Sequence, residues 1–206
     1  MRIPNSRLPT ACRLLAWSTW LLACTADAQA PDLGWIDLDR LRAGDILFDF
    51  GEDPRFRELV RAAVIIDADP EDIWEILTDC GRAPEYVPHV ESCELLETRD
   101  DGLTGIFRQE VKYLWFLPRF EHTFSMRFRP HERIDVERVS GPIEHLKGVW
   151  QILPAGGQGT LLVYDLELRP GLPVPRFLVG ASLRRDIPTI LAEVRDRAEA
   201  LRQNGP

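Results

Sequence analysis

The chain has 206 residues, of which 45% are hydrophobic, and its 25 basic and 33 acidic side chains give a formal net charge of -8 at neutral pH. Such an acidic surface repels nucleic-acid phosphates, so we expect no nucleic-acid partner. The length and the hydrophobic content suit one domain that buries a stable core.

Residues 1–30 have the composition of a secretory signal peptide. Arg2, Arg7 and Arg13 precede an apolar run at 14–23, and Ala28-Gln29-Ala30 resembles an export cleavage site. This run is shorter than the about 20 residues that a membrane-spanning helix needs. We therefore expect a protein that is exported, to the periplasm or as a secreted protein. Cleavage after Ala30 leaves 22 basic and 32 acidic residues, a net charge of -10.

A second interpretation of the N-terminus rests on Leu21-Leu22-Ala23-Cys24, which resembles a bacterial lipobox. Cys24 would then be lipidated and would anchor the mature protein as a lipoprotein. Leucine at the second position of the motif is atypical of a lipobox. Both interpretations predict export, and they differ in whether the protein is anchored.

Cys80 and Cys93 are the cysteines that remain after cleavage following Ala30. In an oxidising compartment the two thiols could form a disulfide. The alternative is two buried free thiols, and the sequence alone leaves both possibilities open.

Residues 31–56 form an acidic N-terminal extension that is punctuated by proline and glycine. Residues 35–41 could make a short helical turn, and residues 46–50 could add a strand. No residue pattern in this extension indicates chemistry. We interpret it as a tether or as an extra edge of the sheet.

The main domain is expected at residues 57–203. Residues 59–66 are rich in valine and isoleucine and predict a strand, and Asp69-Pro70 predicts the start of a short helix that Gly81 ends. Another turn follows at 83–86. Six more strands are predicted at 90–98, 104–115, 119–129, 134–139, 145–153 and 159–168. The short connections between them favour an antiparallel meander.

Residues 172–202 predict a long amphipathic helix, because apolar residues recur at spacings of three and four. Pro175 suits a first helical position, and Asn204-Gly205-Pro206 marks the end. Pro188 lies inside the helix, where it removes a backbone donor and predicts a kink. A helix of this length needs a covering surface, which the strands can supply.

Several stretches resemble a known family. They are residues 64–79, Tyr86-Val87-Pro88, Gly141-Pro142-Ile143, residues 146–150 and the terminal helix. The chain is similar here to the polyketide cyclase/dehydrase and coenzyme Q-binding START-like proteins of the SRPBCC, or Bet v 1-like, helix-grip superfamily. The resemblance implies an α+β fold, in which a seven-stranded antiparallel sheet wraps around the long C-terminal helix. It also implies two short helices after the first strand and an apolar cavity beneath the long helix.

Alternation of apolar and polar residues along the strands places one set of side chains on the face toward the helix. These side chains either line a cavity, as the resemblance implies, or fill the core. The candidate ligand-binding residues are Phe107, Val111, Tyr113, Phe120, His122, Phe124, Met126, Trp150, Tyr164, Leu183 and Ile187.

His122 is the ionisable residue on an otherwise apolar face of its strand. It could orient a ligand carbonyl, or it could be a neutral core residue with one hydrogen bond. If the protein is an enzyme, His122 with Tyr113 or Tyr164 would be the acid and base. The four histidines are scattered and predict no metal site, and no cofactor motif is found.

An apolar rim is predicted where alternate loops of the meander meet the start of the long helix. Its residues are Trp115, Phe116, Leu117, Leu172, Val174 and Phe177. With cations nearby, this rim could touch a membrane surface and take up a lipid-like molecule. The alternative is that these loops pack on one another and close the end of the barrel.

The sequence thus predicts an exported protein that binds a hydrophobic small molecule, such as a lipid, an isoprenoid quinone or a polyketide-like compound, beneath the C-terminal helix. A cyclase or dehydratase acting on such a compound is one alternative. A module that binds protein partners through the apolar rim is another. The oligomeric state stays open.

Overall fold

The computed structural model of the protein describes residues 32–51, 53, 58–113, 118–157, 159–171 and 176–204. The predicted signal peptide with Cys24 lies outside the described residues. So do five of the predicted rim residues, which are Trp115, Phe116, Leu117, Leu172 and Val174.

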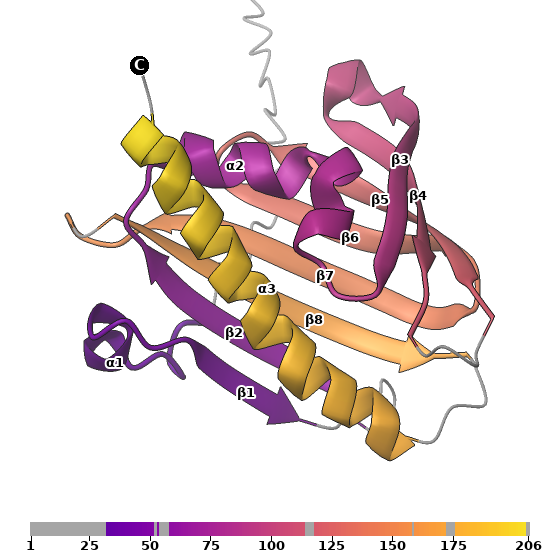
Figure 1. Ribbon diagram of the computed structural model, residues 1–206, viewed down its shortest axis with the longest axis horizontal. Coiled ribbons are helices and arrows are strands. Elements are labelled where there is room, and N and C mark those ends of the chain that lie inside the picture. Colours follow the sequence, from indigo (N-terminus) through magenta and orange to yellow (C-terminus); the bar gives the residue numbers. More distant parts are fainter. Residues whose placement is uncertain are drawn as a thin grey trace, which may run out of the picture. The chain divides into compact units, whose positions relative to one another are not determined.

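Within the described residues, eight antiparallel strands form one sheet in the order β1-β2-β8-β7-β6-β5-β4-β3 (Figure 1). Strands β1 and β3 are therefore the two edges. The strands are β1 Leu47–Gly51, β2 Glu58–Ile66, β3 Val90–Arg99, β4 Thr104–Val111, β5 Phe120–Arg129, β6 Arg133–Ser140, β7 Ile143–Pro154 and β8 Thr160–Pro170. The helices are α1 Leu38–Arg42, α2 Pro70–Thr78 and α3 Arg176–Asn204, with short 3₁₀ helices η1 Cys80–Glu85 and η2 Asp100–Gly102.

The sheet has eight strands, one more than the resemblance implied, because β1 comes from the acidic extension. It pairs antiparallel with β2, from Leu47 opposite Ala63 to Gly51 opposite Leu59. Leu41 of α1 and Leu47 are buried with Ala63 in a cluster that also includes residues of β8. Burial of this apolar surface explains why the extension adds to the sheet rather than hanging as a tether.

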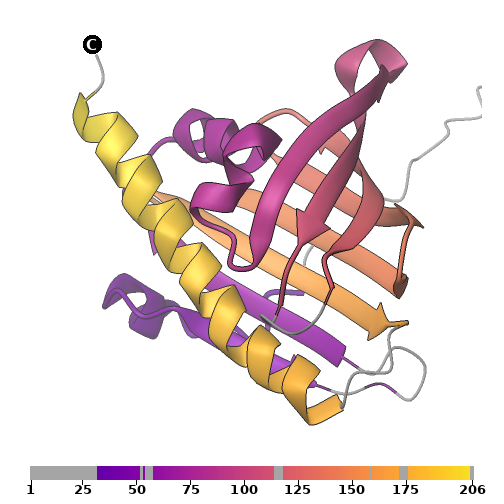
Figure 2. The ribbon, with the colours of Figure 1, turned by 45° about the vertical axis from the view of Figure 1, so that its right-hand side comes forward.

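Helix α3 runs diagonally over β2, and β3, β4 and β5 lie to one side of it (Figures 1 and 2). Its buried side chains recur at the predicted spacing: Ile187, Leu191, Val194 and Ala198 are in the main core cluster. The predicted α+β helix-grip fold is confirmed, and the helix continues through Pro188.

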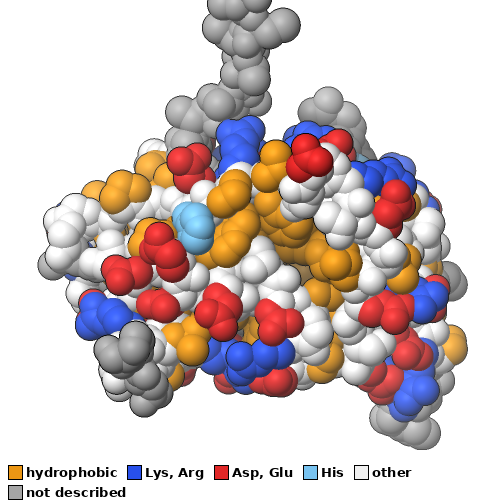
Figure 3. Space-filling view, turned by 90° about the horizontal axis from the view of Figure 1, so that it is seen from above, with side chains coloured by type: hydrophobic (Ala, Val, Ile, Leu, Met, Phe, Trp, Pro, Cys, Tyr) orange, Lys and Arg blue, Asp and Glu red, His pale blue; other side chains and the backbone are white. Residues whose placement is uncertain are grey.

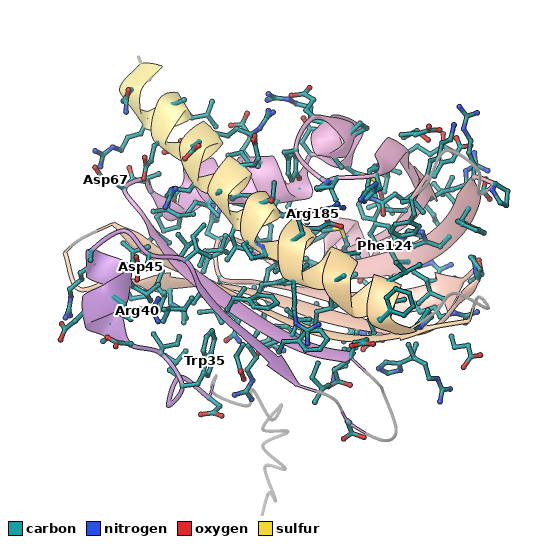
Figure 4. The ribbon with its side chains drawn as sticks, turned by 60° about the horizontal axis from the view of Figure 1, so that its bottom comes forward. Trp35, Arg40, Asp45, Asp67, Phe124 and Arg185 are labelled. Atoms are coloured by element: carbon teal, nitrogen blue, oxygen red, sulfur yellow. A yellow bond between two sulfur atoms is a disulfide. The ribbon has the colours of Figure 1, made fainter. Side chains whose placement is uncertain are left out.

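Ion pairs fasten the C-terminal half of α3. The guanidinium of Arg202 donates two hydrogen bonds to the carboxylate of Asp67, at 2.5 and 2.6 Å, beyond the end of β2 (Figure 4). Arg197 binds Glu85 of η1 at 2.8 Å. This half of the helix is therefore held both by buried aliphatic side chains and by polar contacts.

The face of the sheet toward α3 is called the inner face below. Along β5, His122, Phe124 and Met126 are buried, whereas the intervening Thr123 and Ser125 are only part-buried. The predicted alternation on this strand is therefore confirmed. Several residues on this side of the sheet keep some solvent-accessible surface. They are Val136, Leu146, Trp150, Tyr164 and Leu168 on the inner face and Leu183 on α3. Helix α3 does not seal this face completely.

Candidate functional site

A pocket of about 670 Å³ lies between α2 with η1 on one side and strands β3, β4 and β5 on the other. We call it the aromatic pocket, after its lining by the rings of Trp74, Phe107 and Phe128; Leu95, Leu103 and Cys80 with Cys93 also line it. Figure 3, seen from above α2 and the tip of the β3–β4 hairpin, shows hydrophobic side chains gathered in a hollow with charged ones around them. The residues of α3 are not among its described lining, so this pocket lies beside α2 rather than beneath the C-terminal helix.

A row of packed rings connects the lining of the pocket to the inner face. Trp74 meets Phe128 edge-on at 5.8 Å between ring centroids, and Phe107 meets Phe128 edge-on at 6.4 Å. Phe107 also stacks on Phe124 at 5.8 Å. A side chain at Gly105 would place its Cβ 2.5 Å from the ring of Phe107, so only glycine lets this ring fold back toward Phe128. These offset and edge-on contacts are the geometries that aromatic pairs prefer.

Cys80 of η1 and Cys93 of β3 form a disulfide, with a Cα–Cα distance of 5.4 Å. The structure therefore selects the disulfide over two free thiols. Because both residues line the aromatic pocket, the bond ties the wall formed by η1 to the wall formed by the edge strand β3.

His122 lies on the inner face with 8% of its surface exposed, and its ring is 5.6 Å from that of Phe124. Its Nδ1 is buried and has no hydrogen-bond partner among the described residues. Burial lowers the pKa of the imidazole to about 4, so His122 is neutral at pH 7. At Gly141, with φ of 110°, a Cβ would come within 2.7 Å of the His122 Cα, so the β6–β7 turn packs directly on this residue.

Tyr164 of β8 stacks on Trp150 of β7 at 3.9 Å between ring centroids. Burial raises the pKa of the Tyr164 hydroxyl. A Cβ at Gly148 would lie 3.5 Å from this hydroxyl and 3.4 Å from the Cβ of Val136, so the three residues pack closely here. His122 Nδ1 is therefore a buried polar atom of the inner face for which the described residues supply no partner.

The candidate ligand-binding residues fall into three places. Most lie in the main core cluster along the inner face; these are Phe107, Phe124, Met126, Trp150, Tyr164, Leu183 and Ile187. Val111 and Phe120 pack instead with Ala83 and Val90 in a smaller cluster. Tyr113 follows the end of β4, is 42% exposed, and has its ring 5.4 Å from that of His89. Of the candidates, Phe107 lines the aromatic pocket.

Sequence reasoning missed Trp74, Leu95, Leu103 and the disulfide as parts of one pocket. One signal was present: Leu95 and Leu96 are adjacent apolar residues between the charged residues Glu94 and Glu97. Both stay exposed, at 55% and 49%, and Leu95 lines the pocket.

Two loops of the predicted rim, the β6–β7 turn and the segment that follows β8, contact each other. The backbone N–H of Gly171 donates to the carbonyl of Pro142 at 2.9 Å. Phe177, in the first turn of α3, is 73% exposed. Contact of this rim with a membrane stays a prediction.

Within the described ranges, the side chains form no cluster of three or more His, Cys, Asp or Glu residues suited to a metal ion. The helices in those ranges include none with the length and apolar character needed to cross a bilayer.

Comparisons with known proteins agree with this fold. The model of the family of polyketide cyclases/dehydrases and lipid transport proteins matches residues 66–195. A STAR-related lipid transfer protein from Xanthomonas axonopodis is 18% identical with a TM-score of 0.61, over 73% of this chain and 98% of that one. An aromatase/cyclase from Streptomyces sp. R1128 is 21% identical with a TM-score of 0.57, over 69% and 94%. A START superfamily protein from Mycobacterium smegmatis is 26% identical with a TM-score of 0.55, over 69% and 98%.

No curated protein sequence matches the chain. The two structures that are less than 25% identical to this chain show a shared fold, and no function is inferred from them. The family match covers more than half of the chain, from the last residue of β2 into α3. The chain therefore belongs to the polyketide cyclase/dehydrase and lipid transport family.

Proposed function

We propose that the protein binds a hydrophobic small molecule, such as a lipid, an isoprenoid quinone or a polyketide-like compound, in the aromatic pocket and along the inner face. The observation that carries this proposal is the pocket of about 670 Å³ lined by three aromatic rings. Burying apolar ligand surface gains roughly 25 cal/mol per Å², so a ligand that buries about 300 Å² would gain about 7 kcal/mol before the costs of association. The family match supports the same class of ligand, since its description includes lipid transport.

We also propose that the protein works outside the cytoplasm. The signal-like composition of residues 1–30 motivates this, and the Cys80–Cys93 disulfide supports it because disulfides persist in oxidising compartments. Fractionation of the source cells tests it: the protein should be in the periplasm, the medium or a membrane-anchored exported form, and a cytoplasmic protein would overturn the export proposal.

A cyclase-type enzyme is a second candidate, because the description of the matching family includes polyketide cyclases and dehydrases. His122, whose pKa is lowered by burial, would be the acid–base residue of such an enzyme. A base is most effective when its pKa is near the working pH, and the His122 pKa of about 4 is well below neutrality. Binding without turnover is therefore the function that the site supports better.

The first experiment is native mass spectrometry of the full mature protein purified from its own source, followed by organic extraction of bound molecules. A stoichiometric lipid or quinone is expected. An empty protein that takes up no lipid or quinone would overturn the proposal and would favour a partner-binding role.

A matched pair of variants locates the site. Leu95→Asp places a carboxylate in the aromatic pocket, whereas Leu96→Asp places one beside it on the same strand at similar exposure. We expect Leu95→Asp to lower the amount of bound ligand at least tenfold and Leu96→Asp to leave it unchanged. Equal effects of the two variants would show that the ligand is held elsewhere.

A further inference from the structure

We infer that the ligand of the aromatic pocket is a lipophilic cation, an apolar molecule that carries one ammonium group and neither a phosphate nor a carboxylate. This inference rests on the proposed function and names the class of ligand for the same pocket. It follows from the aromatic rings of the pocket together with the charges in its lining.

The charged side chains in the described lining of the aromatic pocket are both acidic. They are Asp79, which directly follows α2, and Glu94 of β3. Lysine, arginine and histidine are absent from this described lining. An anionic group that entered the pocket would lose hydration and would meet carboxylates of its own sign. The lining therefore disfavours anions and favours a positive group.

Asp79 is the carboxylate that remains for a ligand. The carboxylate of Glu94 is already bound by the guanidinium of Arg108 on β4. Arg82, three residues beyond Asp79, binds Glu85 instead, at 3.2 Å. Asp79 itself forms none of the ion pairs found among the described residues. A negative charge at the wall of the pocket is thus left without a described counter-ion.

The location of Asp79 at the end of a helix strengthens this negative potential. Asp79 is the C-cap residue of α2, and its backbone N–H donates to the carbonyl of Glu75 at 3.2 Å. The carboxyl end of a helix carries a partial negative charge, so a carboxylate there is electrostatically unfavourable and a cation is favourable. A bound cation would therefore be attracted by the side chain and by the helix end together.

The aromatic rings supply the second part of the recognition. An ammonium group over the face of a ring is attracted by the ring quadrupole, most strongly when the ring is a tryptophan. Trp74 lies on α2 and lines the pocket with Phe107 and Phe128. Helix α2 and its C-cap residue thus present a tryptophan ring and a carboxylate to the same pocket. A neutral alcohol would gain the contact with the rings and not the attraction to the charge.

The rest of the ligand has to be apolar and compact. Leu95 and Leu103 add aliphatic surface to the rings, and the volume of about 670 Å³ is within the range of pockets that hold drug-sized molecules. A zwitterionic phospholipid fits less well, because its phosphate would lie beside the same carboxylates as its ammonium group. The charge of the lining therefore separates a simple lipophilic amine from a phosphocholine lipid.

Three matched fluorescent probes test the inference on the full mature protein: pyrenylbutyl-trimethylammonium, pyrenylbutanol and pyrenylbutanoate. They share the ring and the length of the chain and differ in the end group, which is a cation, a neutral alcohol or an anion. We expect the ammonium probe to bind about tenfold more tightly than the alcohol, and the butanoate to bind most weakly. Tightest binding of the alcohol or of the butanoate would overturn the inference.

Variants assign the preference to the pocket. Asp79→Asn removes the charge and keeps the size, so the ammonium probe should then bind about as tightly as the alcohol. Asp79→Lys reverses the charge and should make the butanoate the tightest of the three probes. Glu71→Gln is the control: it removes a carboxylate from the exposed first turn of the same helix, outside the described lining, and should leave the preference unchanged.

Two competitors test the exclusion of phosphate. Dodecyltrimethylammonium and dodecylphosphocholine share the alkyl chain and the quaternary ammonium group, and the second adds a phosphate. Below their micellar concentrations, the first should displace the ammonium probe at a concentration roughly tenfold lower than the second. Equal displacement by the two would overturn the exclusion of phosphate and, with it, the class of ligand inferred here.

The outcomes separate the two proposals. If none of the three probes binds, the proposed function fails, and the inference fails with it. If the probes bind equally well, or if Asp79→Asn leaves the preference unchanged, the function stands and this inference is wrong. If Glu71→Gln lowers the preference as much as Asp79→Asn does, the net negative charge of the protein attracts the probe and the inference is also wrong. Thermal unfolding checks each variant, and Asp79→Asn should not lower the Tm, because it removes a charge that the helix end disfavours.

Discussion

The carboxylate of Asp186 on α3 lies 3.4 Å from Nε2 of His89, in the turn that leads into β3. The same carboxylate accepts hydrogen bonds from Ser182 Oγ at 2.5 Å and from Arg185 Nε at 2.8 Å. Asp186 is buried, and it precedes Pro188 by two residues. This cluster therefore holds the first half of α3 against the turn before the edge strand β3. Fewer aliphatic side chains are buried in this half of the helix than in its second half.

Asp186→Ala should lower the free energy of unfolding by about 1 kcal/mol, because it removes the acceptor of the part-buried Ser182 hydroxyl and of the Arg185 guanidinium. Amide hydrogen exchange should accelerate in residues 178–187 and not in residues 190–204. Asp196→Ala, on an exposed position of the same helix, is the control and should change neither measurement. Acceleration along the whole of α3 would contradict a local fastening.

Replacing Cys80 and Cys93 together by serine should destabilise the protein by about 3 kcal/mol, the chain-entropy value for a loop of about 15 residues. The two cysteines are 13 residues apart. Urea unfolding measures the loss, and wild-type protein in reductant should match the variant. The affinity for the extracted ligand should fall as well, because the disulfide no longer links the two walls of the aromatic pocket. Unchanged binding on reduction would show that η1 and β3 hold the pocket without the bond.

Two glycines in the β7–β8 connection should differ sharply in their tolerance of alanine. Both have positive φ, 66° at Gly156 and 84° at Gly159. A Cβ at Gly159 would overlap the carbonyl oxygen of Ile66, whereas one at Gly156 meets nothing within 4 Å. Gly156→Ala should cost about 1–2 kcal/mol from its φ alone, and Gly159→Ala should cost at least 2 kcal/mol more. Similar thermal unfolding of the two variants would argue against this packing.

His122 predicts a loss of stability in acid. Its pKa is about 4 in the folded protein and about 6.5 when unfolded, so the unfolded chain binds more protons between these values. Stability is then lost as the pH falls from about 6.5 to about 4, by up to about 3 kcal/mol in total. His122→Phe should remove this part of the acid sensitivity. Urea unfolding of both proteins at several pH values gives the difference, and parallel curves would contradict a buried neutral histidine.

The strands and helices could be predicted from the sequence because they depend on the spacing of residues that are close together in the chain. The alternation through His122, Phe124 and Met126 predicted both β5 and the residues on its inner face, and the spacing through Ile187, Leu191 and Val194 predicted the buried stripe of α3. The ends were less certain. The strand predicted at 104–115 ran to residue 115, whereas β4 ends at Val111, so Tyr113 is not on the inner face.

By itself the sequence determined the strands and helices, their order and the polarity of their faces, since each follows from local periodicity and turn chemistry. The helix-grip arrangement of these elements was implied by the resemblance to a known family. Only the tertiary structure decided the site. The β3–β4 hairpin lies against α2 and η1. This arrangement places Trp74 and Phe107 in the lining of one pocket and brings Cys80 within bonding distance of Cys93. That Nδ1 of His122 lacks a partner among the described residues is a property of everything that packs around it, which depends on contacts between residues far apart in the chain.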